Sequence, residues 1–377
     1  DDQAAALTQH WHEAGDLQKE AHYAYRAGSK AYDLGQFHQA LRLLGRAADL
    51  MPTNSPEQWD ANFIMIKSHR FLGALDTVVG LAKSAVEMAK TMNDEARQLR
   101  SIIELIYVLQ LLGRRSESEA RIAEALPRAE ALGNPLILMS ILNRAGFQAG
   151  SSGDLDNALT YHLRAQALAD EHGSEEDKAI LLNNLSLVYY YKGDIDKALS
   201  MGDQLIKTYR AMNNMHYLSD TYSNQGVLLW SQGKYAEAIP ILERALELDV
   251  RLGKEQNEAT TLITMGYCYA GLNEDDTAEF YLLLALRRAN AINAVPLVLD
   301  ALSGIASLWA KRGDHARAAE VYGLALSHPS TDTDLKHTVN PLIDALRPHL
   351  DDAALDAALE RGKSLDLDTL VAQTLEQ

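Results

Sequence analysis

Apolar residues recur at helical spacing through most of the sequence. After Gly233, for example, they occupy positions Ala238, Ile239, Ile241, Leu242, Ala245 and Leu246. Spacing of three and four residues gathers side chains on one face of a helix, whereas a half-buried strand alternates apolar and polar residues. The pattern therefore predicts an all-α protein.

The predicted helices are separated by turns that recur every forty residues. Gly193-Asp-Ile-Asp-Lys-Ala198 is one such turn, and its first position is repeated at Gly73, Gly113, Gly153, Gly233, Asn273 and Gly313. A helix that ends in a left-handed residue needs Gly there, and Asn is the next best tolerated choice. Six consecutive equal gaps indicate a repeat protein. Half a period per helix gives antiparallel pairs of helices about 25 Å long.

Small residues recur at fixed positions of this unit. Counting the turn glycine as position 15, position 8 is Gly at 28, 146, 226 and 266, and positions 20 and 27 are mostly Ala. This pattern resembles the tetratricopeptide repeat (TPR) family, although the family's unit is 34 residues long. The resemblance covers roughly residues 17–328, or eight helix pairs. The pairs with Ile66 and Ile106 at position 8 depart from it, and we expect wider helix spacing there.

The resemblance implies a right-handed superhelical solenoid whose concave groove is lined by the first helix of each pair. On a helical wheel, positions 2, 5, 9 and 12 of that helix share the groove face. We expect a ligand-binding groove formed by Lys67, Arg70, Arg100, Asn143, Phe147, Asn183, Tyr190, Ser223, Trp230 and Tyr267.

Two groups of these residues have an alternative explanation. Asn side chains can donate to and accept from a peptide backbone, but Asn143 and Asn183 could equally bond the adjacent repeat. Lys67, Arg70 and Arg100 could bind a ligand carboxylate or phosphate. They could instead pair with nearby acids, for which the candidates are Asp60, Asp76 and Glu104.

The two ends carry a second resemblance. His12-Glu-Ala-Gly-Asp16 and Arg26-Ala-Gly28, with Leu324-Ala-Leu-Ser-His-Pro329 and Ser364-Leu-Asp-Leu-Asp-Thr-Leu370, resemble the C-terminal part of bacterial signal-transduction ATPases with numerous domains (STAND). The resemblance implies a sensor that binds an inducer and relieves autoinhibition of an ATPase and winged-helix module. We expect residues 1–16 to be a junction, 17–328 the array, and 329–377 a linker and helical cap. Because the chain starts at Asp1, we expect it to be part of a larger protein.

Composition restricts the function further. The 377-residue chain has 47% apolar residues and a net charge of −17. Such a field repels phosphate backbones and anionic lipids, so we expect neither nucleic acid nor membrane as a partner. The single cysteine, Cys268, fits a reducing compartment, and we expect a cytoplasmic protein.

The sequence contains no recognisable catalytic or cofactor motif. Phosphate-loop, dinucleotide-binding, serine-hydrolase and H-E-x-x-H patterns are all missing. We therefore expect no enzyme and no cofactor. Two other functions stay open beside the STAND sensor: a free-standing TPR adaptor that binds peptides, and a repeat-type receptor for a bacterial signalling peptide. The inducer could be a small molecule, a peptide or a protein.

Overall fold

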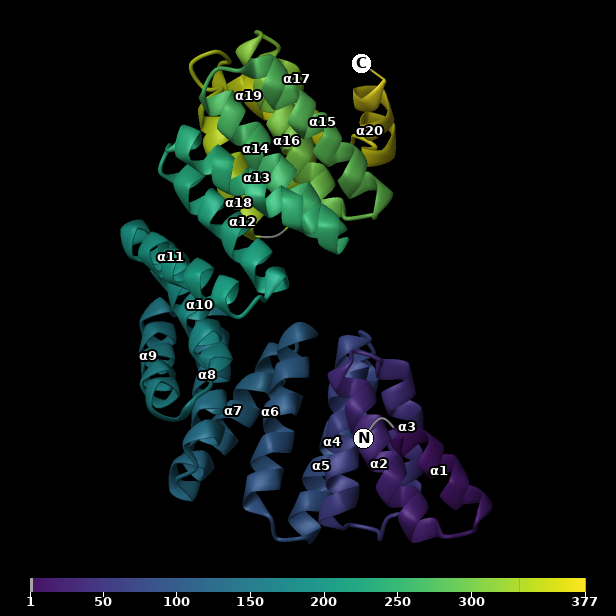
Figure 1. Cartoon of the computed structure of the whole chain (residues 1–377). Coiled ribbons are helices and arrows are strands. Elements are labelled where there is room, and N and C mark those ends of the chain that lie inside the picture. Colours follow the sequence, from purple (N-terminus) through teal and green to yellow (C-terminus); the bar gives the residue numbers. More distant parts are fainter. Residues whose placement is uncertain (1–2, 332, 377) are drawn as a thin grey trace. The chain divides into compact units, whose positions relative to one another are not determined.

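The computed structural model describes residues 3–331 and 333–376, and this part of the chain contains helices and no strands (Figure 1). The all-α prediction is therefore confirmed. The chain divides into two compact units, Asp1–Lys192 and Gly193–Gln377. The expected linker and cap, residues 329–377, include residue 332, which lies outside the described residues.

The described part of the first unit contains ten helices. They are α1 (Ala4–Glu13), α2 (Leu17–Asp33), α3 (Phe37–Leu50), α4 (Pro56–Phe71), α5 (Leu75–Thr91), α6 (Glu95–Leu111), α7 (Arg115–Leu132), α8 (Pro135–Ser151), α9 (Leu155–His172) and α10 (Glu175–Tyr191). The described helices of the second unit are α11 (Ile195–Ala211), α12 (Met215–Ser231), α13 (Tyr235–Leu252), α14 (Glu255–Gly271), α15 (Asp275–Ala291), α16 (Val295–Lys311), α17 (His315–Ser327), α18 (Thr333–Asp344), α19 (Asp352–Gly362) and α20 (Leu367–Leu375).

The turns follow the forty-residue period. Each glycine of the series has a positive φ, and Asn273, its one non-glycine member, has φ 61°. A second series closes the turns between pairs with Asn93, Gly133, Asn213, Gly253 and Asn293, again at positive φ. Asn tolerates this region better than other residues with a Cβ, so the choice of Asn at these turns follows from sterics.

The glycine at position 8 allows the two helices of a pair to approach closely. A Cβ placed on Gly28 would stand 2.7 Å from the Leu44 side chain, and Gly266 faces Leu282 in the same way. The pairs that carry Ile66 and Ile106 at this position, α4/α5 and α6/α7, pack less closely than α2/α3 or α14/α15. The expected wider spacing of these two pairs is confirmed.

One pair has a small residue at both interlocking positions. Position 8 is Ser186 in this pair, and Gly202 occupies position 24, where Leu44 and Leu282 face the glycines of their own pairs. Every other pair of the eight has a large side chain at one or both positions. The boundary between the two units falls within this pair, between α10 and α11.

Within each unit, the first helices of successive pairs are neighbours. In the first unit α2, α4, α6, α8 and α10 contact one another in order, and in the second unit α12, α14 and α16 do so (Figure 1). The second helices lie behind them. Each unit therefore presents a continuous face built from first helices, as the TPR resemblance implied.

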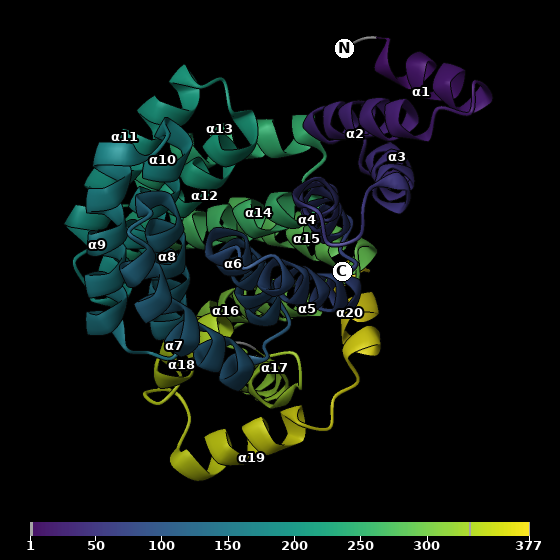
Figure 2. The same cartoon turned by 90° about the horizontal axis from the view of Figure 1, so that it is seen from below.

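The terminal helices pack on the outermost helices of the two units. At one end α1 packs on α2, and at the other α19 packs on α17 (Figure 2). The α17–α19 contact is close because Gly323 lies against the backbone of Leu359, and Gly362 against that of Glu320. Side chains from α18 to α20, including Leu355 and Val371, share the core of the last repeats.

Candidate functional site

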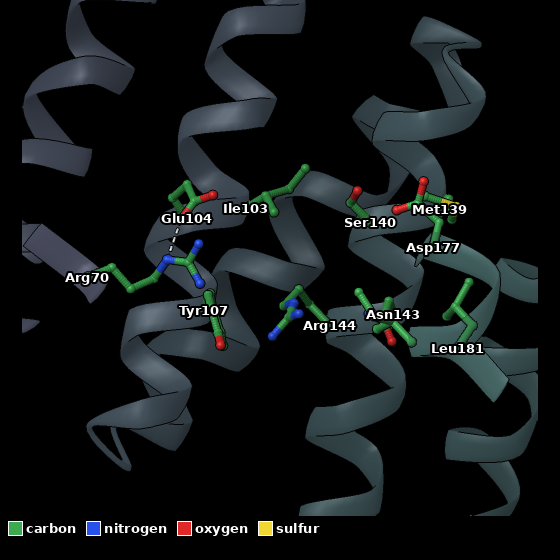
Figure 3. Close-up of a pocket in the computed structure, with 11 residues that line it drawn as sticks. Arg70, Ile103, Glu104, Tyr107, Met139, Ser140, Asn143, Arg144, Asp177 and Leu181 are labelled. Atoms are coloured by element: carbon green, nitrogen blue, oxygen red, sulfur yellow. Dashed lines mark ion pairs between the residues drawn. The ribbon is translucent and has the colours of Figure 1, made fainter. Parts of the chain in front are cut away.

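A pocket of about 190 Å³ opens on the first-helix face of the first unit (Figure 3). Four consecutive first helices line it: α4 contributes Arg70, α6 Tyr107, α8 Arg144, and α10 Leu181. These residues are about one repeat apart in sequence, so the pocket exists only because the repeats stack in register.

Arg70 and Glu104 form an ion pair at one side of the pocket. The Arg70 Nε lies 3.4 Å from Glu104 Oε2, and the two side chains are 20% and 12% exposed. Neither of these two atoms has a hydrogen-bond partner among the described residues. The guanidinium also lies over the ring of Tyr107, 4.7 Å from its centroid. The contact is thus a charge pair without the bidentate geometry of a strong Arg–carboxylate bond.

Arg144 lies against the same tyrosine ring. Its guanidinium is 4.2 Å from the Tyr107 centroid, and it forms no ion pair with any residue that the structure describes. Burial lowers the pKa of Arg144, partly offset by the Tyr107 hydroxyl and Glu104. An Arg side chain stays protonated at neutral pH, so a half-buried positive charge faces the pocket without a counter-ion.

Lys67 and Arg100 lie beside Phe63 rather than in ion pairs. The Lys67 Nζ and the Arg100 guanidinium are each 4.9 Å from the Phe63 centroid. Burial lowers the pKa of Lys67. The Glu104 carboxylate partly offsets this shift, and the positive charges of Arg100 and Arg70 add to it. The pairing alternative thus holds for Arg70, which has Glu104. It does not hold for Lys67 or Arg100 among the described residues.

The asparagines next to the pocket bond each other. Asn184 Nδ2 donates to Asn143 Oδ1 at 2.7 Å, across the boundary between two repeats. Asn143 lines the pocket but is only 8% exposed. Its side chain therefore bonds the adjacent repeat, which is the alternative explanation given for it on the sequence. Asn183 and Tyr190 are half-buried, and Phe147 is 45% exposed.

The three expected residues of the second unit differ from the expectation of an open groove. Ser223 is buried, with its Oγ 3.1 Å from Thr261 Oγ1. Tyr267 is also buried and donates its hydroxyl proton to Asp300 Oδ1 at 2.8 Å. Half-buried Trp230 packs on Tyr267, with ring centroids 5.5 Å apart. Ser223 and Tyr267 therefore hold neighbouring repeats together, since their bonding partners lie on the next first helix.

Among the pocket residues that the sequence did not predict, Glu104 and Arg144 carry its charge. Glu104 and Arg144 both occupy position 6, which was not assigned to the groove face. Position 6 lies only about 40° from position 2 on a helical wheel, so long side chains there reach the same hollow. For Glu104, the available signal was a charged residue between two apolar neighbours, Ile103 and Leu105.

Other chemistry is sparse in the described part of the chain. Cys268 is fully buried, and burial raises the pKa of its thiol to about 12, which fits a structural residue. Among the described residues no three or more His, Cys, Asp or Glu side chains could together hold a metal ion. No described helix is both long and apolar enough to cross a membrane.

Comparison with protein families and solved structures agrees with the fold. Residues 137–211 and 217–291 match a tetratricopeptide repeat family model. No curated protein matches the sequence. BtubC from P. vanneervenii is 25% identical with a TM-score of 0.52, covering 58% of this chain and 92% of its own.

Two further solved structures share the fold. A Rap protein complexed with competence and sporulation factor is 16% identical, with a TM-score of 0.57 over 73% of this chain and 76% of its own. A STAND protein with a tetratricopeptide repeat sensor, from Pyrococcus horikoshii, is 15% identical, with a TM-score of 0.57. The match covers 89% of this chain but 54% of that protein. At these identities the likeness concerns the fold.

Proposed function

Because the chain contains tetratricopeptide repeats, we propose that it is a binding domain whose first-helix face receives a ligand or a protein partner. The cationic pocket of the first unit is the observation that carries this proposal. Arg70 and Arg144 line it together with Glu104. Lys67, whose charge interacts with Glu104, Arg70 and Arg100, adds a further positive charge nearby, in a chain whose net charge is −17. Clustered cations with this little compensation favour an anionic group on the partner.

We further propose that this domain is the sensor of a STAND regulator. The array would bind an inducer and thereby relieve autoinhibition of an ATPase and winged-helix module of the same polypeptide. The sequence motifs at both ends and the fold of the STAND neighbour support the proposal. An inducer that binds two conformations with different affinity is sufficient to operate such a switch. The proposal includes the division into junction, array and cap, a cytoplasmic location, and no catalytic role.

A receptor for a signalling factor is the second candidate. It is favoured by the Rap structure, whose fold this chain shares and which was solved with competence and sporulation factor. The complete reading frame separates the candidates. A phosphate loop with a winged helix upstream would support the STAND sensor, whereas a short helix-turn-helix upstream would support the receptor.

Binding itself is tested with the purified chain. Libraries of peptides and small metabolites are screened by thermal shift, because a ligand that binds only the folded state raises the unfolding temperature. Each hit is then titrated against the Lys67→Glu and Arg70→Glu variants. We expect weaker binding in both, with the fold retained. Hits whose affinity is the same in both variants would contradict a role for this pocket.

A further inference from the structure

We propose that the pocket binds an oxyanion, either a carboxylate or a phosphate, that is attached to a small apolar group. Arg144 is the main residue that binds the oxyanion, and the Glu104 carboxylate competes with it for the cations of the pocket. The inference rests on the proposed binding function and adds to it the chemistry of the ligand and the residue that recognises it.

Arg144 offers its guanidinium to the pocket. A guanidinium presents five N–H donors in a planar fork that matches an oxyanion. In this structure the fork contacts the Tyr107 ring and has no carboxylate partner among the described residues. Burial and, to a smaller extent, the Arg144 charge lower the pKa of His162 to about 4, so His162 is neutral at pH 7. A negatively charged group of a ligand would therefore be stabilised beside the Arg144 guanidinium.

Glu104 lines the pocket together with Arg70 and Arg144. It is the carboxylate that acts on both Lys67 and Arg144, and it already pairs with Arg70. Yet its Oε2 forms no hydrogen bond within the described chain. Glu104 thus neutralises the cations only in part, and its own charge opposes entry of an anion. Figure 3 shows its pair with Arg70 on the opposite side of Tyr107 from the free guanidinium.

The remaining walls of the pocket include four apolar side chains. Ile103, Met139, Ile180 and Leu181 line the pocket and supply apolar surface. The other acid, Asp177, accepts from the backbone N–H of Ser174 at 3.0 Å and from its hydroxyl at 2.7 Å. Asp177 is therefore committed to capping α10, and it does not create a cation site. The combination fits an anion attached to a compact apolar group.

The test uses three probes on the whole chain, measured by isothermal titration calorimetry. N-acetyl-leucine carries a carboxylate, phenyl phosphate carries a phosphate, and N-acetyl-leucinamide is the neutral control. We expect at least one anion to bind and the amide not to bind. The anion that binds more tightly identifies the source of the oxyanion. Failure of both anions, or equal affinity for the amide, would overturn the proposal.

Three variants locate the binding. Arg144→Gln should lower the affinity for the anion about tenfold or more, because charge-assisted hydrogen bonds are lost. Glu104→Gln should raise the affinity for the anion, because the competing negative charge is removed. Arg164→Gln is the control: Arg164 lies on α9 and pairs with Glu130 at the surface. Equal loss in Arg164→Gln, or no gain in Glu104→Gln, would contradict the assignment.

Two further readouts keep the test decisive. If Arg144→Gln unfolds, Arg144→Lys replaces it, because Lys retains the charge but loses the fork. The unfolding midpoint is measured for every variant. If the probes fail while a screened partner still depends on Lys67 and Arg70, the oxyanion inference falls and the proposed binding function stands.

Discussion

Asn184 on α10 donates a 2.7 Å hydrogen bond to Asn143 on α8, so the first helices of two successive repeats are joined by a polar contact. The neighbouring residues Leu181 and Leu142 are fully or almost fully buried. In such surroundings a hydrogen bond has little competition from water, and an unpaired amide is costly. The contact fixes the register of one repeat on the next.

We predict that Asn184→Ala lowers the free energy of unfolding by about 1 to 2 kcal/mol, because Asn143 Oδ1 then stays buried without a donor. Urea titration of the purified chain measures the difference. Asn183→Ala is the matched control: it removes the same group from the adjacent residue, for which the structure gives no such bond, and should cost less. Equal costs would mean that the bond contributes nothing.

Gly28 gives a second prediction. A Cβ there would meet the Leu44 side chain at 2.7 Å and its backbone nitrogen at 3.1 Å, so α2 and α3 must move apart. We expect Gly28→Ala to destabilise by about 1 to 3 kcal/mol. Gly45→Ala, at a helical site with open space, should instead be neutral or stabilise by up to about 1 kcal/mol. Similar effects of the two substitutions in thermal unfolding would refute the close-approach explanation.

His162 should make stability depend on pH. Burial, with the Arg144 charge, lowers its pKa from 6.5 to about 4. Between these values the unfolded chain binds the proton more readily, so the free energy of unfolding falls as pH falls from about 6.5 to 4. The loss would be on the order of 3 kcal/mol at most. Leu242 occupies the equivalent position of another repeat, where it also faces a glycine. The substitution His162→Leu should therefore be tolerated and should remove the pH dependence that His162 causes. An unchanged pH slope in that variant would contradict it.

Asp249 should act in the opposite direction. Burial raises its pKa from 3.8, although Ser219 and Lys254 partly offset the shift. The folded chain then holds the proton more tightly, so stability falls as pH rises above 3.8 through the raised pKa. Asp249→Asn keeps an acceptor for the Ser219 hydroxyl and removes the charge. We expect it to raise stability at neutral pH, measured by urea unfolding at pH 5 and 7.5. A loss at pH 7.5 would show that the carboxylate is needed in its charged form.

Much of the fold follows from single residues of the sequence. Gly193 and Asn273 mark turns because few other residues tolerate positive φ. Gly28 and Gly266 indicate close helix pairs because any side chain there would meet Leu44 or Leu282. These are local steric constraints, so the sequence shows them directly.

The site was less predictable because its environment comes from other repeats. Ser223 and Tyr267 lie on the expected face, but their partners Thr261 and Asp300 come from the next first helix and bury them. Arg144 was missed because only a full packing of α6 against α8 shows that its side chain reaches Tyr107. Spacing along one helix cannot show which neighbour satisfies a polar group.

The buried state of Cys268 has a practical consequence. With its thiol enclosed and its pKa raised to about 12, it should react poorly with maleimides. A cysteine introduced on each unit could then carry a donor and an acceptor dye without background labelling. Energy transfer between the dyes would report the distance between the units in solution, before and after a partner is added.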